Sequence, residues 1–294
     1  MLSIDVGYGN VKVYNGEEVA GFPSVYKEVS SSYIPTTDAN DQILELDGVK
    51  YHVGMTALKM AGFAPFDKED LLRHKIFMLT AICAFGDKDY SDTVALGLPI
   101  GDYKFMADKL KKLKGTYDVT FNGKKRTIEI KKISVYAQSE AVYKLLARET
   151  PSVREEIVGI VDVGQKTVDF AYFNEGAFIG ERSGSIEQGV INAYQSIATA
   201  VENTLGFAID DYKAKKYIEK VPEASEKAFE DMAKTIKDRL IRKHWNFKEM
   251  DAIYIVGGGT SYVAPLFTDA PYREIDEQTA VFANAYGYYA GEKK

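Results

Sequence analysis

Residues 4–13 read I-D-V-G-Y-G-N-V-K-V, and residues 161–170 read V-D-V-G-Q-K-T-V-D-F. Each stretch has an apolar run, an Asp, an apolar residue, a Gly, three further residues and a second apolar run. A turn signal follows each copy, Asn15-Gly16 after the first and Asn174-Glu175-Gly176 after the second. The pattern predicts a strand, a glycine turn, a strand and a hairpin at the start of each half. Because the copies are half the chain apart, they favour two related lobes over a short tandem repeat.

The composition is that of an ordinary globular protein. The chain has 294 residues, of which 46% are hydrophobic and 27% are charged, which is enough for two domains with real cores. The net charge of −6 disfavours direct binding to nucleic acid. Cys83 is the only cysteine, so no internal disulfide forms, and its apolar neighbours predict a buried thiol. We see no signal peptide and no apolar run of membrane-helix length, so we expect a cytoplasmic protein without membrane association.

Turn residues and periodicity predict further elements in the first half. Asp47-Gly48 and Asn122-Gly123 lie between β-like runs and predict two hairpins. Residues 91–98 form an apolar run that predicts a central strand. Two amphipathic helices are expected, over residues 68–85 and 102–114. Their predicted inward-facing residues are Leu72, Ile76, Leu79 and Cys83 in the first, and Phe105, Met106, Leu110 and Leu113 in the second.

The second half is predicted to be mainly helical outside its opening strands. Helices are expected over residues 187–205, 210–220, 223–243 and 277–290, with a strand at 251–256. The first of these helices should bury Val190, Tyr194, Ile197, Val201 and Leu205. The third should bury Phe229, Met232, Ile236 and Leu240.

The glycine turns are candidate phosphate-binding loops. A strand that ends in such a turn exposes successive backbone N–H groups, which form a concave site for anions. Two such loops facing each other would hold a polyphosphate between the lobes. A third glycine run follows the strand at 251–256 and favours close approach of the backbone to a ligand. The candidate residues are Gly7, Tyr8, Gly9 and Asn10 in the first loop, Gly164, Gln165, Lys166 and Thr167 in the second, and Gly257, Gly258, Gly259 and Thr260 in the third.

Charged residues beside these loops suggest a bridging cation. Asp5 and Asp162 would repel phosphate directly, and Mg²⁺ is commonly held by one or two carboxylates, water and phosphate oxygens. Lys12, on the strand that leaves the first loop, would add a positive charge near the β- or γ-phosphate. We therefore expect both aspartates to hold Mg²⁺.

Gln138 lies where a strand is expected to end and a helix to begin, with Ser139 as the N-cap. A Gln side chain is no strong base, but it can orient an attacking water, which suits hydrolysis of a γ-phosphate. Simpler interpretations stay open at this point. A lone D-x-G is typical of β-turns, three glycines also occur where a strand crosses to a helix, and a lone Gln is usually a surface residue.

Taken together and in order, these motifs resemble those of the actin-like ATPase superfamily. Residues 5–12 resemble its first phosphate loop, residues 162–169 its second and residues 256–260 its adenosine loop. Gln138 falls on the first connecting helix, and residues 280–287 resemble the second. With Phe22-Pro23-Ser24 included, the chain looks most like the ParM/StbA plasmid-segregation actins and archaeal actin-like proteins. It departs from many relatives at Gln165-Lys166, where they carry glycines.

The resemblance implies an α/β, ribonuclease H-like, duplicated two-domain fold with the nucleotide in the interdomain cleft. The expected domains are residues 1–155, with an insertion lobe at about 23–67, and residues 156–294, with an insertion lobe at about 207–248. The final helix is expected to pack back on the first domain. The implied function is a filament-forming ATPase, using ATP or GTP and Mg²⁺, with a cytoskeletal or DNA-segregation role and an adaptor protein on the DNA. The alternatives are a small-molecule kinase of the same superfamily and a nucleotide-binding regulator that does not polymerise.

Overall fold

A computed structural model of the chain describes residues 1–29, 42–60, 71–86 and 88–293. The chain forms two units. Unit 1 comprises residues 1–98, 102–137 and 284–294, and unit 2 comprises residues 99–101 and 138–283. Parts of the expected first insertion lobe, residues 30–41 and 61–67, lie outside the described residues, as do residues 68–70 of the first expected helix.

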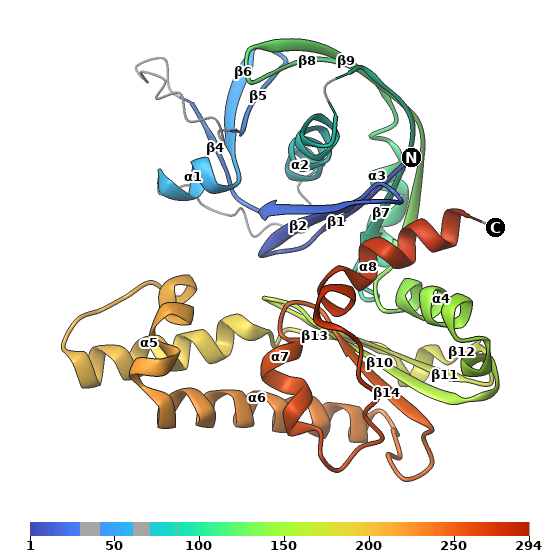
Figure 1. The fold of residues 1–294 in the computed structure, drawn as a ribbon, viewed down its shortest axis with the longest axis vertical. Coiled ribbons are helices and arrows are strands. Elements are labelled where there is room, and N and C mark those ends of the chain that lie inside the picture. Colours follow the sequence, from blue (N-terminus) through green and yellow to red (C-terminus); the bar gives the residue numbers. More distant parts are fainter. Residues whose placement is uncertain (30–41, 61–70, 87, 294) are drawn as a thin grey trace. The chain divides into compact units, whose positions relative to one another are not determined.

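Unit 1 is built on a nine-stranded mixed sheet. Its order is β3-β2-β1-β7-β9-β8-β5-β6-β4, with β1 antiparallel to β2 and parallel to β7. The sheet curls around helix α2 (Figure 1). The strands are β1 (Leu2–Val6), β2 (Asn10–Tyr14), β3 (Val19–Pro23), β4 (Tyr26–Glu28), β5 (Gln42–Leu46), β6 (Val49–Val53), β7 (Tyr90–Leu98), β8 (Gly115–Phe121) and β9 (Lys124–Ala137), and the helices are α1 (Met55–Lys59), α2 (Leu71–Ala84) and α3 (Tyr103–Lys111).

Helix α2 is enclosed by the curled sheet and is therefore buried on most of its surface. Ile76, Leu79 and Cys83 are buried as predicted, but Leu72 is 42% exposed. The prediction of a single apolar stripe was wrong because the sheet wraps around the helix, so the buried set also includes Arg73. Burial raises the pKa of the Cys83 thiol to about 11, which makes it an inert core group.

Helix α3 buries Met106, Leu110 and the following Leu113, as its periodicity predicts. The prediction that Phe105 faces inward was wrong, because its side chain is 77% exposed. Residues 105 and 106 are about 100° apart on an α-helix, so a helix that buries Met106 and Leu110 turns Phe105 away.

The end of the last helix, α8 (Glu277–Glu292), belongs to unit 1 from residue 284 onward. The ring of Tyr14 lies 4.7 Å from that of Tyr286 and 5.0 Å from that of Tyr289. Glu292 accepts a 2.9 Å hydrogen bond from Lys132. These contacts fix the end of the chain on strands β2 and β9.

Unit 2 repeats the inner part of this arrangement in a smaller sheet. Its order is β12-β11-β10-β14, with β13 also paired to β11. Strand β10 is antiparallel to β11 and parallel to β14, so it has the neighbours that β1 has in unit 1. The strands are β10 (Ile157–Val163), β11 (Val168–Asn174), β12 (Ala177–Phe178), β13 (Gly184–Ile186) and β14 (Ala252–Val256). The related cores predicted from the duplicated sequence are confirmed by this shared order.

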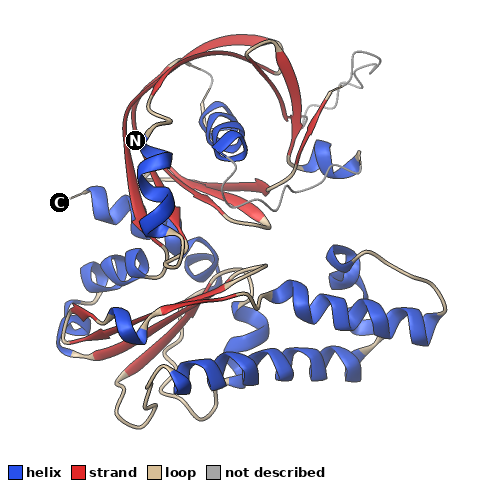
Figure 2. Cartoon of the chain, turned by 180° about the vertical axis from the view of Figure 1, so that it is seen from behind, coloured by secondary structure: helices blue, strands red, loops and turns tan. Residues whose placement is uncertain are grey.

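Helices cover both faces of the unit 2 sheet (Figure 2). Val161 and Val163 pack with α5, α6 and α7, whereas Val158 and Ile160 pack with α4, as the two-residue period of a strand requires. The helices are α4 (Glu140–Glu149), α5 (Val190–Leu205), α6 (Pro222–Arg242) and α7 (Thr260–Val263), with short 3-10 segments η1 (Pro151–Glu155), η2 (Gly180–Arg182), η3 (Asp211–Lys220) and η4 (Ala264–Leu266).

The predicted helices of unit 2 are largely confirmed. The apolar stripe of α6 is buried, and so are the predicted α5 residues except Leu205, which is 41% exposed at the end of the helix. The segment expected as a helix at 210–220 is the 3-10 helix η3. No helix in the described part of the chain combines the length and the apolar character needed to cross a membrane.

The hairpins form as the turn residues predict. Asp47-Gly48 and Asn122-Gly123 have positive φ at both positions, as a type I′ turn requires. Glu175 and Gly176, between β11 and β12, also have positive φ at both positions. The Asn15-Gly16 loop is longer, because Tyr14 pairs with Val19.

Candidate functional site

The first loop, Gly7 to Asn10, connects β1 to β2 and needs glycine where it begins. A Cβ atom on Gly7 would lie 2.8 Å from the backbone oxygen of Asn10, closer than a side chain tolerates. Asp5 lies one residue before the strand end, 2% exposed, opposite Lys12 in the sheet register. The Lys12 Nζ lies 3.6 Å from an Asp5 carboxylate oxygen. The predicted residues of this loop are thus brought together, with the acid and the lysine as an ion pair.

Two side chains that the sequence did not single out for this site hold the first loop. Arg73, 3% exposed on α2, donates a 2.9 Å hydrogen bond to the carbonyl of Gly7. Its guanidinium lies 5.4 Å from the ring centre of Tyr8. Ser24 donates a 2.6 Å hydrogen bond to the same Gly7 carbonyl, and its N–H donates to Gly9 at 3.0 Å. The only sequence signal was Ser24 in the Phe22-Pro23-Ser24 motif.

The second loop, Gly164 to Thr167, has the same shape as the first. A Cβ atom on Gly164 would lie 2.8 Å from the backbone oxygen of Thr167, which matches the value for Gly7 and Asn10. The N–H of Gly164 donates to that oxygen at 3.0 Å. Replacement of glycine by Gln165 and Lys166 therefore leaves the turn itself intact.

Backbone hydrogen bonds from the start of α5 hold the second loop. The N–H groups of Val190 and Ile191, which begin α5, donate to the carbonyls of Gly164 and Gln165 at 3.1 and 2.9 Å. A Cβ atom on Gly189 would lie 2.3 Å from the backbone oxygen of Gln165. The start of α5 thus lies directly against the loop, and Gly189 is required for that contact.

The residue opposite Asp162 in the sheet is Asp169, where the first copy has Lys12 opposite Asp5. Asp169 is 2% exposed and accepts hydrogen bonds from the N–H of Ile100 at 3.1 Å and the hydroxyls of Thr167 at 3.3 Å and Ser185. Burial, and secondarily the charge of Asp162, raise the pKa of Asp169 to about 7. The second copy therefore has two acids at the strand end where the first has an acid and a base.

The third loop, Gly257 to Thr260, packs on the second. A Cβ atom on Gly257 would lie 2.3 Å from Oδ1 of Asp162, and one on Gly259 would lie 2.4 Å from Cγ1 of Val163. Gly258 has no atom within 4 Å of its Cβ position. Packing accounts for the outer two glycines, and the middle one presents an open stretch of backbone beside Asp162.

Gln138 lies directly after β9 and begins the second and longer segment of unit 2, with a side chain that is largely buried. The next residue, Ser139, is the N-cap of α4 and has a φ of 62°. A positive φ at a residue other than glycine is uncommon and concentrates at functional sites. The chain therefore turns from β9 into α4 through a backbone conformation that is unusual for serine, directly after Gln138.

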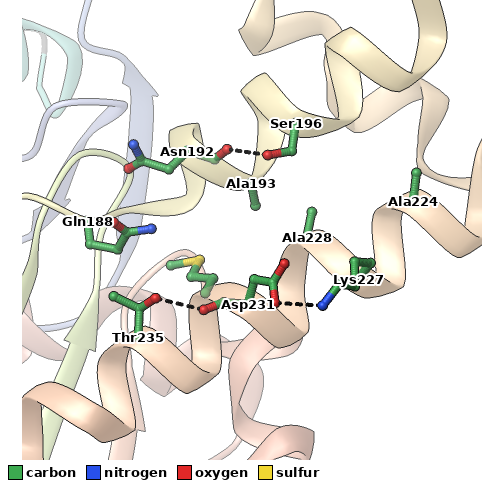
Figure 3. A pocket seen from close by; sticks show the side chains of 10 residues that line it. Gln188, Asn192, Ala193, Ser196, Ala224, Lys227, Ala228, Asp231 and Thr235 are labelled. Carbon is green, nitrogen blue, oxygen red and sulfur yellow. Dashed lines mark hydrogen bonds and ion pairs between the residues drawn. The ribbon is translucent and has the colours of Figure 1, made fainter. Parts of the chain in front are cut away.

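A pocket of about 300 Å³ lies between α5 and α6, in the same unit as the second loop (Figure 3). Gln188 and Asn192 line one end of the pocket. The Asn192 side chain accepts a 2.9 Å hydrogen bond from the N–H of Gly189. Lys227 and Asp231 form a 2.9 Å ion pair on the α6 side. The floor is made of small and apolar residues, Ala193, Ala224, Ala228 and Met232, and Ser196 and Thr235 complete the lining.

No group of three or more His, Cys, Asp or Glu side chains suited to a metal ion occurs within the described ranges. The acids expected to hold the metal are Asp5 in unit 1 and Asp162 in unit 2, the latter with Asp169 opposite it in the sheet. Single carboxylates fit Mg²⁺, which keeps several waters and takes further oxygens from phosphate.

Comparisons with known proteins agree with this geometry. Residues 3–140 match the family model for the N-terminal domain of actin-like proteins, and residues 160–269 match that for the C-terminal domain of the archaeal MreB-like actin homologue. The chain belongs to the actin-like superfamily. The expected actin-like fold is confirmed.

Solved structures resemble this actin-like chain along its whole length. The archaeal actin homolog Ta0583 is 21% identical with a TM-score of 0.87, covering 100% of this chain and 99% of its own. Its complex with ADP aligns with a TM-score of 0.83 at 21% identity over the same shares. ParM from a 15-stranded Clostridium botulinum filament is 20% identical with a TM-score of 0.83, covering 99% and 98%. No curated protein matches the sequence.

Proposed function

We propose that this actin-like chain binds a nucleoside triphosphate, hydrolyses it with Mg²⁺ and assembles into filaments. The repeated loop carries this proposal, because a Cβ atom on Gly7 and one on Gly164 would each lie 2.8 Å from the backbone oxygen three residues on, in two separate units. Each loop follows a strand whose penultimate residue is a buried Asp. Two such anion-binding turns in one chain suit a polyphosphate. The ADP complex of Ta0583 and the ParM filament are the relatives that support nucleotide binding and assembly.

In this proposal the three loops bind nucleotide through their backbone N–H groups. Asp5 and Asp162 hold Mg²⁺ through water, and the ion would neutralise charge on the phosphate oxygens. The Lys12 ammonium group would interact with phosphate while it stays close to the Asp5 carboxylate. The open backbone at Gly258 leaves room for a ligand to approach the third loop.

We assign the nucleoside to the pocket between α5 and α6. Gly189 links the two sites, because it contacts the second loop and bonds to Asn192 in the pocket lining. The small floor at Ala193 and Ala228 suits a flat ring, and the amides and charged groups around it suit a base and a ribose. ATP and GTP both fit this description.

Gln138 is proposed to orient the attacking water. Its amide donates and accepts hydrogen bonds without acting as a strong base, which suits slow hydrolysis. The turn at Ser139 would keep the amide in place between turnovers.

Assembly, a cytoplasmic location and an adaptor protein that links filaments to DNA follow from the family and belong to this proposal. So do the domains at residues 1–155 and 156–294.

The test combines pelleting, light scattering and phosphate release with ATP, GTP, ADP and no nucleotide. Polymer that depends on triphosphate, together with phosphate release, is the expected result. Turnover that needs an acceptor alcohol would instead indicate a kinase, and binding without polymer or hydrolysis would indicate a regulator.

Asp162→Ala and Gln138→Ala test the catalytic roles in the same assay. Both should bind nucleotide and lose about 100-fold or more in phosphate release, since each removes a group that acts on the reacting phosphate. Glu149→Ala, an exposed change at the end of α4, is the matched control. Hydrolysis by Asp162→Ala at the parental rate would refute the metal assignment.

A further inference from the structure

The pocket between α5 and α6 contains an ion pair, formed by Lys227 and Asp231. The Nζ atom of Lys227 lies 2.9 Å from Oδ1 of Asp231. The two side chains are 69% and 60% exposed, so the pair is open to a ligand that enters the pocket from solvent. Among the described residues that line the pocket, Asp231 is the only acid and Lys227 the only base. Exposed Glu230 and Lys234, which are of opposite charge, lie on the same helix but outside the lining.

The hydroxyl groups of the lining are bonded to the helices that carry them. The hydroxyl of Ser196 donates to the carbonyl of Asn192 at 3.4 Å, and that of Thr235 donates to the carbonyl of Asp231 at 2.8 Å. The ion pair uses one oxygen of the carboxylate and one N–H of the ammonium group. The Asp231 side chain therefore presents Oδ2 to a ligand, and Lys227 presents two further N–H groups.

The ion pair lies away from the end of the pocket that adjoins the second loop. Figure 3 shows Gln188 and Thr235 at one end and Lys227 toward the other. Gln188 is next to Gly189, which packs against the second loop, so a phosphate bound by that loop lies at the Gln188 end. Ser196, toward the Lys227 end, lies seven residues beyond Gly189 on α5, which is about 10 Å. In a nucleotide placed this way, the ribose lies nearer the loop and the base meets the ion pair.

The ion pair matches the hydrogen-bonding edge of guanine. That edge has two adjacent donors, N1–H and the N2 amino group, followed by the O6 acceptor. The two oxygens of Asp231 accept from both donors, while the Lys227 ammonium donates to O6. Adenine has one donor group, at N6, beside an acceptor at N1, so it uses only one oxygen of the carboxylate and makes one hydrogen bond fewer. The small floor at Ala193 and Ala228 accepts either ring, so the edge of the base makes the difference.

We propose that this chain prefers guanine nucleotides to adenine nucleotides, and that Asp231 and Lys227 bind the edge of the base. The proposal rests on the nucleoside site proposed above and specifies the base that this site selects. The complex of Ta0583 with ADP, at 21% identity, shows that a related protein binds an adenine nucleotide. Because water competes for so exposed a pair, we expect a preference of about 10-fold and not an exclusion of adenine.

Affinities for GDP, ADP and xanthosine diphosphate test this preference, measured by titration calorimetry of the full chain with Mg²⁺. The parent should bind GDP about 10-fold more tightly than ADP. Xanthine carries an oxygen where guanine has the N2 amino group. Asp231→Asn replaces one carboxylate oxygen with an NH₂ donor, so affinity for GDP should fall at least about 10-fold and affinity for xanthosine diphosphate should rise above that of the parent. Lys227→Met should lower the affinity for GDP without a gain for xanthosine diphosphate.

Asp238→Asn is the matched control, because it makes the same change at an exposed acid of α6 that does not line the pocket. It should leave all three affinities unchanged. Thermal denaturation checks the fold of each variant, and the exposed positions of Lys227 and Asp231 should leave the Tm close to that of the parent.

The outcomes separate the choice of base from nucleotide binding itself. A parent that binds none of the nucleotides overturns both proposals. A parent that binds ADP as tightly as GDP, or more tightly, overturns only the preference for guanine. A preference for GDP that persists in Asp231→Asn, or a loss of GDP affinity without a gain for xanthosine diphosphate, refutes the pairing of Asp231 with the base. If Asp231→Asn weakens all three nucleotides equally and no longer distinguishes GDP from 2′-deoxy-GDP, Asp231 binds the ribose instead.

Discussion

The first and second glycine loops have the same shape but are held in different ways. In unit 1, side chains distant in sequence fix the loop, with Arg73 and Ser24 both bonded to the Gly7 carbonyl. In unit 2, the backbone at the start of α5 does so through Val190 and Ile191. The comparison teaches that the duplicated motif specifies the turn, while each unit supplies its own support. Variants that remove one kind of support should therefore affect one loop and not the other.

The largest effect is expected at Gly189. An Ala side chain there would meet the backbone of Gln165 and Lys166 at 2.3 to 2.6 Å, and backbone cannot rotate away as a side chain can. Gly189→Ala should lower the free energy of unfolding by about 3 kcal/mol, the upper end for overpacking. Urea denaturation gives the value. Gly258→Ala, which meets open space, is the control and should change stability by less than about 0.5 kcal/mol.

The next effect concerns the acid that replaces lysine in the second copy. The pKa of Asp169 is raised to about 7 in the folded protein, above its ordinary value of 3.8. The folded state therefore keeps a proton that the unfolded state releases, so the stabilising contribution of Asp169 is fully present below about pH 4 and is lost as pH rises to about 7. Between pH 5 and pH 7 this group should remove about 2 kcal/mol of stability.

Asp169→Asn should abolish that pH dependence, because Asn does not titrate. Urea denaturation of the protein without nucleotide or Mg²⁺, at pH 5 and pH 7, measures it. Asp118→Asn, a change at an exposed acid of β8, is the comparison. A slope that persists in Asp169→Asn would place the titrating group elsewhere.

Removal of the Arg73 guanidinium should weaken the support of the first loop. Arg73→Met keeps much of the side-chain volume but removes the charged hydrogen bond to the Gly7 carbonyl, which is worth about 2 kcal/mol. Thermal denaturation should detect this loss, and nucleotide affinity should fall with it because the loop loses its fixed position. Arg73→Lys should recover part of both. Unchanged affinity in a destabilised Arg73→Met protein would limit Arg73 to a role in the core.

The smallest effect is expected at Tyr8. Tyr8→Leu removes the ring near the Arg73 guanidinium and should cost about 0.5 to 1 kcal/mol in a double-mutant cycle with Arg73→Met. No coupling between the two changes would mean that the ring contributes nothing to holding the first loop.

Local sequence patterns were sufficient to predict much of the fold. The glycines of the loops, the hairpin turns at Asn122-Gly123 and the buried stripe of α6 depend on neighbours in sequence, and their patterns predicted them. Leu72 and Phe105 were misplaced because periodicity gives the spacing of apolar residues but not which face the rest of the fold covers. In α2 the curled sheet covers almost every face.

The supports of the loops depend on partners that sequence patterns do not mark. Arg73 lies 66 residues from Gly7, and a charged residue in a predicted helix is normally assigned to solvent. The contact between Gly189 and Gln165 depends on how closely α5 approaches the loop, which no motif encodes. Asp169 was inside the quoted stretch, but its network with Ile100 and Ser185 required the structure.

The membership of residues 284–294 in unit 1 has a consequence for synthesis on the ribosome. Tyr286 and Tyr289 pack on Tyr14, and Glu292 bonds to Lys132, so the first unit to begin emerging cannot complete its packing until the last helix has been translated. All residues of unit 2, which end at residue 283, are translated before the last segment of unit 1. Multidomain chains usually complete their N-terminal domain first as they are made. Here the order of completion is reversed, and a nascent chain would wait without the contacts that the last helix makes with β2 and β9.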